Sequence, residues 1–141
     1  MVDFLSKECR SSLMSRVKNR NTSAERFVRK VVWSAGFRYR LNVRELPGTP
    51  DLVFRRYCTV VFVQGCFWHS HSCPKGQRRP TSNREFWNRK LDGNVARDTA
   101  NHKMLRELDW HVFLIWECDL HQGTDALLEH LRTRRAASKH E

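Results

Sequence analysis

Long apolar runs are absent from the 141-residue sequence, and acidic residues are few. No segment approaches the roughly 18 consecutive apolar residues of a membrane-spanning helix, so we expect no membrane association. Residues 1–10 mix charged and polar side chains without the apolar stretch of a secretory signal. These two absences together predict a cytoplasmic protein.

Acidic side chains number only 15 against 26 lysines and arginines, which leaves a formal net charge of +11. A surplus of this size in a short chain indicates a polyanionic partner such as nucleic acid. The basic residues are scattered over several segments rather than gathered on one amphipathic helix, so a membrane surface is the weaker interpretation. The alternative is a basic protein that has no polyanionic partner.

Cysteine is present in odd number, at Cys9, Cys58, Cys66, Cys73 and Cys118. In a reducing compartment, an odd count argues against a disulfide framework and favours metal binding or simple packing. For Cys9, and for Cys58 inside an apolar run, packing is the preferred interpretation.

The first half of the chain predicts a basic arm, a helix and three short strands. Residues 1–21 form the arm. Thr22 and Glu25 match a capping box, apolar residues at helical spacing follow, and Gly36 suits the position that ends a helix. Strand-like runs then lie at 37–43, 51–54 and 58–63. The last run is almost continuously apolar, which predicts a central strand buried on both faces.

The second half begins with a loop over residues 64–81 that is rich in Gly, Pro, Cys and His. Ser82 and Glu85 match a second capping box, which opens a helix through Leu91. Four further elements are predicted: a helix at 94–108, a strand at 110–116, a helix at 126–134 and a disordered basic tail at 136–141. The element order predicts one α/β domain over residues 22–135, with a mixed sheet flanked by helices.

Two thiols and two imidazoles fall within eight residues, at Cys66, His69, His71 and Cys73. Thiolate and neutral imidazole are the ligands that zinc prefers, in a tetrahedral site that needs four of them. Cys118, just beyond the last predicted strand, is the candidate for the distant ligand. Four protein ligands would make the zinc structural. The spacing leaves open which histidine binds, and buried free thiols are the alternative.

The sequence around these ligands resembles the very short patch repair (Vsr) mismatch endonucleases. The resemblance covers residues 11–118, and its matching segments are Phe62–Cys73, Leu46–Asp51, Glu85–Lys90, Asn94–Asp98 and Trp116–Cys118. It implies a restriction-endonuclease-like fold and a bacterial, nucleoid-associated protein. The implied reaction nicks one DNA strand 5′ to the thymine of a T·G mismatch. This nick would initiate repair of deaminated 5-methylcytosine. The resemblance also implies a functional link to a cytosine-5 DNA methyltransferase and a repair polymerase.

The resemblance also implies roles for individual residues. Asp51 matches the aspartate that binds catalytic magnesium, and the backbone carbonyl of Val63 matches its second protein ligand. His69 matches the general base, and Glu25 matches an acidic residue that supports the water network. The zinc ligands match Cys66, His71, Cys73 and Cys118. The aromatic side chains that wedge into the duplex match Phe67, Trp68 and Trp87.

Each role has a structural alternative. Asp51 follows a proline and suits a turn, and Glu25 suits its capping box. Family members often carry histidine where this chain has Gln64, and glutamine holds a water by hydrogen bonds but takes no proton. The wedge aromatics have packing as their alternative, and Trp33, Trp110 and Trp116 are predicted to lie in the core. Arg79 is one of several candidate phosphate contacts, with a solvated surface position as its alternative.

The sequence contains a residue that can act as the base in phosphodiester hydrolysis. Residues 63–65 offer neither a carboxylate nor a lysine, so an uncoordinated histidine, with an ordinary pKa of about 6.5, is the reasonable base. Two other functions stay open: a zinc-stabilised DNA-binding module without nuclease activity, and a nickase of the same fold with relaxed mismatch choice. A monomer is expected, because one nick needs one active site.

Overall fold

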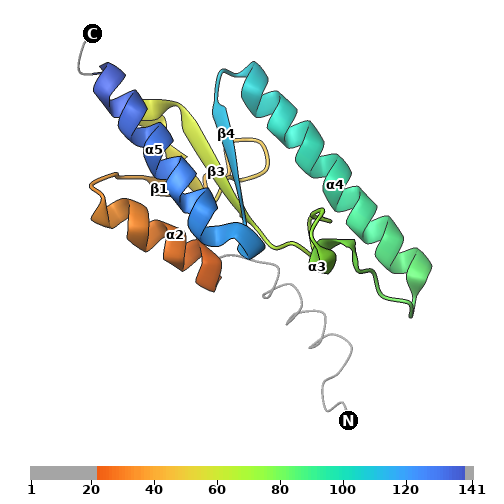
Figure 1. The fold of residues 1–141 in the computed structure, drawn as a ribbon. Helices are drawn as coiled ribbons and strands as arrows, with labels where there is room; N and C mark the ends of the chain where they lie inside the picture. The colour runs from red at the N-terminus through yellow and green to blue at the C-terminus, as the bar shows by residue number, and fades with distance from the viewer. Residues whose placement is uncertain (1–21, 139–141) are drawn as a thin grey trace.

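The computed structural model describes residues 22–138, so the predicted arm at 1–21 and residues 139–141 lie outside it. Figure 1 shows the described elements, which follow in the order α2 (Ser23–Ser34), β1 (Arg40–Leu41), β2 (Leu52–Phe54), β3 (Thr59–Gln64), α3 (Pro74–Gln77), α4 (Arg84–Glu107), β4 (His111–Trp116) and α5 (Leu120–Ser138). Two 3-10 turns follow β2 and β4, η1 (Arg55–Tyr57) and η2 (Glu117–Asp119).

The four strands form one mixed sheet in the order β1-β2-β3-β4. β2 pairs antiparallel with both β1 and β3, whereas β3 and β4 run parallel, with Gln64 opposite Trp116. A parallel pair needs a long crossover, and α4 supplies it. Almost every residue of β3 is buried, as its apolar sequence predicted. The mixed sheet flanked by helices is therefore confirmed.

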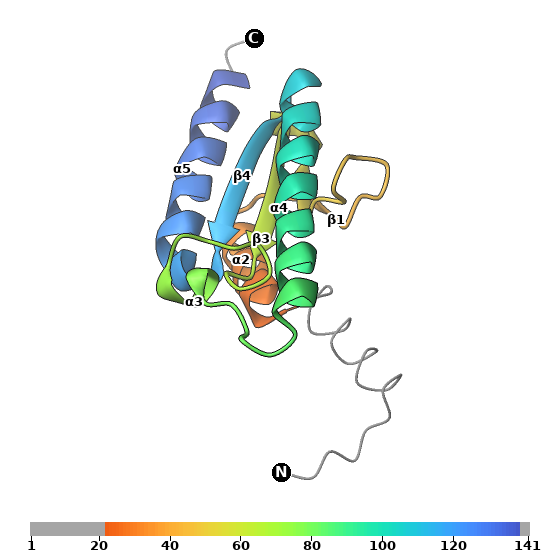
Figure 2. The ribbon, with the colours of Figure 1, turned by 90° about the vertical axis from the view of Figure 1, so that its right-hand side faces the viewer.

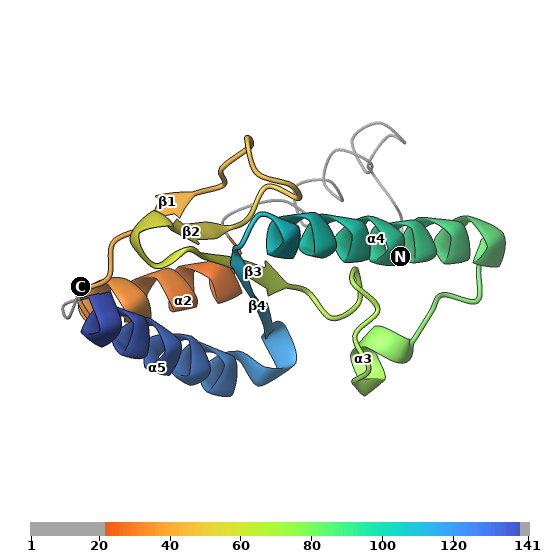
Figure 3. The same ribbon diagram turned by 90° about the horizontal axis from the view of Figure 1, so that it is seen from above.

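Helices cover both faces of the sheet. α2 and α5 pack on one face, and α4 lies along the other (Figures 2 and 3). In β2, Leu52 and Phe54 join the cluster beneath α2 and α5, whereas Val53 joins the cluster that contains Leu105 of α4. Each such buried side chain contributes roughly 1.5–3 kcal/mol. Packing from both sides fixes the strand ends on which the site is built.

The start of α2 follows the predicted capping box. The Thr22 hydroxyl accepts a hydrogen bond from the Glu25 backbone N–H at 3.2 Å. Gly36 adopts φ +93° directly after the C-cap residue, a left-handed conformation that glycine takes at little steric cost. Both predicted helix boundaries are therefore confirmed, and they place Glu25 in the first turn.

The predicted second capping box is wrong. Asn83, not Ser82, caps α4, with φ 52° and no side-chain hydrogen bond. α4 is also one continuous helix where we predicted two. Leu91 and Leu105 are both fully buried on it, and packing of this apolar stripe outweighs the roughly 1 kcal/mol cost of Gly93 in a helix.

Three other element predictions need correction. The strand predicted at 37–43 shortens to the two residues of β1. The helix predicted at 126–134 begins at Leu120 and continues through Ser138, so the first three residues of the predicted tail are helical. Residues 74–77 of the predicted loop form the short helix α3.

Two predicted core side chains are at the surface. Trp33 is 50% exposed, because it lies on the outer side of α2 beneath the Arg38 guanidinium at 3.6 Å. Cys58 is exposed because its backbone turns through φ 48° at the end of η1, before β3 begins. Trp110 and Trp116 are partly buried. Among residues 22–138, no helix has the length and apolar character that crossing a bilayer requires.

Candidate functional site

One edge of the sheet gathers the chemically active residues. Parallel strands end at the same edge, so the loop after β3 lies beside the turn after β4. β2 runs antiparallel to β3 and therefore begins at this edge, directly after Asp51. The Asp51 backbone N–H donates to the Val61 carbonyl at 3.0 Å, which continues the pairing of β2 with β3.

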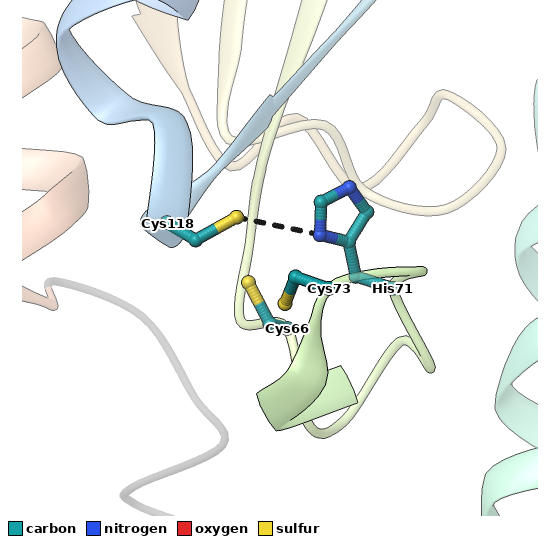
Figure 4. Close-up of side chains that lie close together, drawn as sticks. All are labelled: Cys66, His71, Cys73 and Cys118. Carbon is teal, nitrogen blue, oxygen red and sulfur yellow. Dashed lines mark hydrogen bonds between the residues drawn. The ribbon is translucent and has the colours of Figure 1, made fainter. Parts of the chain in front are cut away.

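Four ligand-type side chains converge here: Cys66, His71, Cys73 and Cys118. Their donor atoms all lie within 4.8 Å of one another. The Cys118 Sγ and the His71 Nδ1 are 3.4 Å apart, and Figure 4 shows Cys118 reaching the loop from the end of β4. Three thiols and one imidazole fit a tetrahedral zinc ion in their number and chemistry. His69 is outside this set, which answers the question that the spacing had left open.

The loop geometry depends on close backbone packing that sequence reasoning missed. The His71 N–H donates to the Cys66 carbonyl at 3.0 Å, and the His71 ring stacks on Trp116 at 4.1 Å. A Cβ atom on Gly76 would lie 2.1 Å from the His71 carbonyl oxygen, so only glycine fits there. The sequence carried no signal for this close approach, because residues 64–81 were predicted as a loop and α3 is seen only in the structure.

Neighbouring groups set opposite pKa shifts on two of the thiols. The Gly76 backbone N–H lowers the pKa of Cys73 to about 6. Burial raises the pKa of Cys66 to about 12, so ionising this thiol requires a cation. Glu117 accepts a hydrogen bond from the Cys66 N–H at 3.3 Å and pairs with Lys75 at 2.9 Å.

A second group surrounds Asp51 in a cavity of about 280 Å³, whose lining includes Glu25, Val63, Gln64, His69 and Asp98. The Asp51 carboxylate accepts a hydrogen bond from the Val63 N–H at 2.7 Å. Burial and the nearby Glu25 carboxylate raise the pKa of Asp51 to about 7. A carboxylate that ionises so reluctantly fits a site for a divalent cation, which would favour the charged form.

His69 pairs with Asp98, which projects from α4. The His69 Nδ1 lies 2.5 Å from the Asp98 carboxylate oxygen. His69 also lines an adjoining cavity of about 320 Å³ that contains Glu25, Lys75 and Glu117. The sequence segment Asn94–Asp98 was singled out, but nothing in its spacing could assign Asp98 to a histidine 29 positions earlier.

Gln64 lies between these two cavities and lines both of them. The residue is only 3% exposed. Within residues 22–138 its side-chain amide makes no hydrogen bond, so the amide is available to a ligand that enters either cavity.

The three predicted wedge aromatics form one cluster. The Phe67 ring lies 5.1 Å from Trp68 and 5.7 Å from Trp87. Asn94 is buried and donates to the Trp68 carbonyl at 3.0 Å, which ties the cluster to α4. Phe86 extends the cluster, at 5.4 Å from Trp87 and with 58% exposure, and sequence reasoning missed it.

Comparison with known proteins identifies the family. The family model described as DNA mismatch endonuclease Vsr matches residues 2–75, which is just over half of the chain. The chain belongs to the DNA mismatch endonuclease Vsr family.

Relatives that match over most of their length support the same family assignment. The chain is 44% identical over 120 residues to the type II nicking enzyme V.XorIIP of Xanthomonas oryzae pv. oryzae, covering 85% of this chain and 88% of that protein. It is 42% identical over 120 residues to V.NmeAIP of Neisseria meningitidis, covering 85% of each. It is 36% identical over 135 residues to the DNA mismatch endonuclease Vsr of Escherichia coli, covering 96% of this chain and 85% of that protein.

The resemblance found in the sequence is therefore confirmed, and the Vsr family supports a DNA endonuclease. The structure brings together nearly all the residues that the resemblance singled out. Asp51, Glu25, Val63 and His69 share one cavity. The four predicted zinc ligands form the Cys/His cluster whose donor atoms lie within 4.8 Å of one another. The Val63 group that contacts Asp51 is its N–H, whereas the resemblance assigns a role to its carbonyl.

Proposed function

We propose that this protein nicks one DNA strand 5′ to the thymine of a T·G mismatch and so initiates very short patch repair of deaminated 5-methylcytosine. The observation that carries the proposal is the position of His69. Its imidazole is outside the Cys/His cluster, bonded to Asp98, and lines the same cavity as Asp51. An uncoordinated imidazole beside a partly buried carboxylate is suited to hydrolysis of a phosphodiester.

Two metals fit the donor sets. Cys66, His71, Cys73 and Cys118 would hold structural zinc, which would link the loop after β3 to the turn after β4. Asp51 and the Val63 carbonyl would hold magnesium. Bound there, magnesium supplies polarisation of the scissile phosphate and relief of charge on the leaving oxygen. A single protein carboxylate suffices because magnesium keeps several waters and takes phosphate oxygens as ligands.

His69 is the proton acceptor in this proposal. The Asp98 carboxylate accepts a hydrogen bond from the protonated Nδ1, which leaves the Nε2 unprotonated. That nitrogen removes a proton from the attacking water. Glu25 supports the same water network from the first turn of α2, while its backbone N–H stays bonded to Thr22.

The aromatic cluster supplies selectivity. Phe67, Trp68 and Trp87 stack in place of neighbouring bases when they enter the duplex, at an unstacking cost of a few kcal/mol per step. A mismatch lowers this cost. The partner is therefore double-stranded DNA that contains a T·G mismatch, and the net charge of +11 favours its phosphates.

Several broader expectations accompany the proposal. The sheet and its flanking helices correspond to a restriction-endonuclease-like core. The protein acts as a monomer in the bacterial cytoplasm, associated with the nucleoid and linked functionally to a cytosine-5 DNA methyltransferase and a repair polymerase. A non-catalytic DNA-binding module and a nickase with relaxed mismatch choice are the two alternatives.

A nicking assay separates these functions. Wild-type protein is incubated with labelled duplexes that carry T·G, each other mispair or a matched pair, with magnesium and with EDTA. We expect magnesium-dependent nicking 5′ to the thymine of the T·G duplex alone. Binding without nicking would favour the non-catalytic module. Equal nicking of several mispairs would favour the relaxed nickase.

A further inference from the structure

Arg79 lies between α3 and α4, and its guanidinium joins two separate parts of the site. Its Nη1 donates to the Asn88 side-chain oxygen at 3.1 Å. Its Nη2 donates to the Asp92 carboxylate at 2.8 Å and to the Ser70 hydroxyl at 3.3 Å. Ser70 belongs to the loop after β3, whereas Asn88 and Asp92 belong to α4. One side chain therefore bridges the loop and the helix.

The two bridged parts carry different functional groups. Ser70 follows His69 directly and adopts φ 50°, so the chain turns sharply beside the histidine. On α4, Asn88 follows Trp87, and Asp92 lies about a turn and a half before Asp98. The bridge therefore sets the loop that carries His69 against the helix that carries its carboxylate partner.

The Arg79 contacts are part of a longer row of hydrogen bonds between the loop after β3 and α4. The Asn94 side chain bonds the Trp68 carbonyl at 3.0 Å, and Asp98 bonds the His69 ring at 2.5 Å. The Arg79 contacts with Asn88 and Asp92 lie nearest the start of α4. Besides these contacts, the aromatic cluster and the two bonds that involve Trp68 and His69 also join the loop to α4.

We propose that Arg79 is a positioning residue that fixes the His69 loop against α4, and not a contact to the DNA backbone. Three of its hydrogen bonds are already made within the protein, and its side chain is 30% exposed. A planar guanidinium suits this geometry because it presents several donors in a fixed fork. Neighbouring Arg78 has the same charge but is exposed and makes no hydrogen bond or ion pair within the described residues.

The inference rests on the proposed nicking function, and the test measures rate and affinity separately. Single-turnover nicking of a T·G duplex is measured at saturating protein, with DNA affinity measured over a range of salt concentrations. Arg79→Gln should lower the nicking rate about 10- to 100-fold, since a displacement of about 1 Å at a reacting group costs on this order. Its affinity and salt dependence should match those of the control, Arg78→Gln, whose nicking rate stays at the wild-type value.

Two more variants sharpen the test. Arg79→Lys should recover only part of the rate, because one ammonium group cannot reproduce the fork. Asp92→Asn should also slow nicking, and because the carboxylate is 67% exposed, the Tm of this variant should stay at the wild-type value. An unchanged nicking rate in Arg79→Gln would overturn the proposal, whether or not affinity falls. Tighter DNA binding with an unchanged rate in Asp92→Asn would overturn it too.

Hydrogen exchange distinguishes failure of this inference from failure of the nuclease function. Arg79→Gln should speed amide exchange in residues 66–73 and in the first turns of α4, with zinc content unchanged. This readout is valid even if the wild-type protein binds DNA without nicking it. Exchange rates equal to wild type would contradict the proposed bridge.

Discussion

At the scale of single residues, Asp51 has the clearest pH signature. Burial raises its pKa to about 7 in the folded protein, well above the value of about 3.9 for an unfolded chain. The folded state therefore favours the protonated carboxyl, and this contribution to stability is complete below pH ~4 and is lost as the pH rises through about 7.

Asp51→Asn should remove this dependence. Without divalent cations, the variant should gain thermal stability over wild type as the pH rises from about 4 to about 8. Magnesium added at the upper end of this range should stabilise wild type and leave Asp51→Asn unchanged. Calorimetric Tm measurements across the range check both statements. Parallel Tm curves for the two proteins would show that Asp51 is not perturbed.

The hydrogen bond between the Asp98 carboxylate and the His69 ring predicts that Asp98 contributes to the nicking rate. Asp98→Asn should reduce single-turnover nicking by roughly 10²-fold, because an amide does not hold the Nδ1–H tautomer as a carboxylate does. DNA affinity should stay unchanged. Glu107→Gln, at the exposed end of the same helix, is the matched control and should nick at the wild-type rate. A wild-type rate for Asp98→Asn would remove it from the mechanism.

At the scale of elements, sequence patterns predicted the helix ends and strands that depend on neighbouring residues in the chain. The Thr22 capping box and Gly36 set the ends of α2 correctly, and the apolar run of β3 became the buried inner strand. These patterns failed where tertiary packing decides. α4 continues through Gly93 because its buried stripe extends on both sides, and Ser82 does not cap the helix. Neither outcome can be read from a window of a few residues.

The loop between β3 and α4 depends on Gly76. Gly76→Ala should displace the His71 backbone, since the new Cβ would lie 2.1 Å from its carbonyl oxygen. We expect loss of bound zinc and a lower Tm. Zinc stoichiometry by atomic absorption, with thermal unfolding, checks this outcome.

Gly93→Ala is the matched control for that substitution. The nearest atom to its new Cβ is the Arg97 Nη1 at 3.7 Å, so the helix accommodates alanine and gains up to about 1 kcal/mol. Full zinc binding in Gly76→Ala would mean that the loop relaxes without cost, and the packing argument would be wrong.

At the scale of the whole molecule, the site is assembled from distant segments. The sequence alone indicated zinc ligation by two cysteines, a neighbouring histidine and the distant Cys118. The resemblance singled out Asp51, His69 and the choice of His71 as the zinc ligand. Two partners could not be predicted. Asp98 reaches His69, and Arg79 reaches Ser70 and Asp92, only because α4 lies beside the loop. Which residues face each other across a helix–loop contact depends on the fold.

The most direct test of the account is to measure zinc content and nicking together in His69→Ala. The central claim is that neighbouring histidines have separate roles, His71 with the thiols and His69 with Asp51 and Asp98. We predict that His69→Ala retains one zinc per chain and binds a T·G duplex like wild type, yet loses magnesium-dependent nicking by at least about 10²-fold. Loss of zinc from this variant, or nicking at the wild-type rate, would contradict the account.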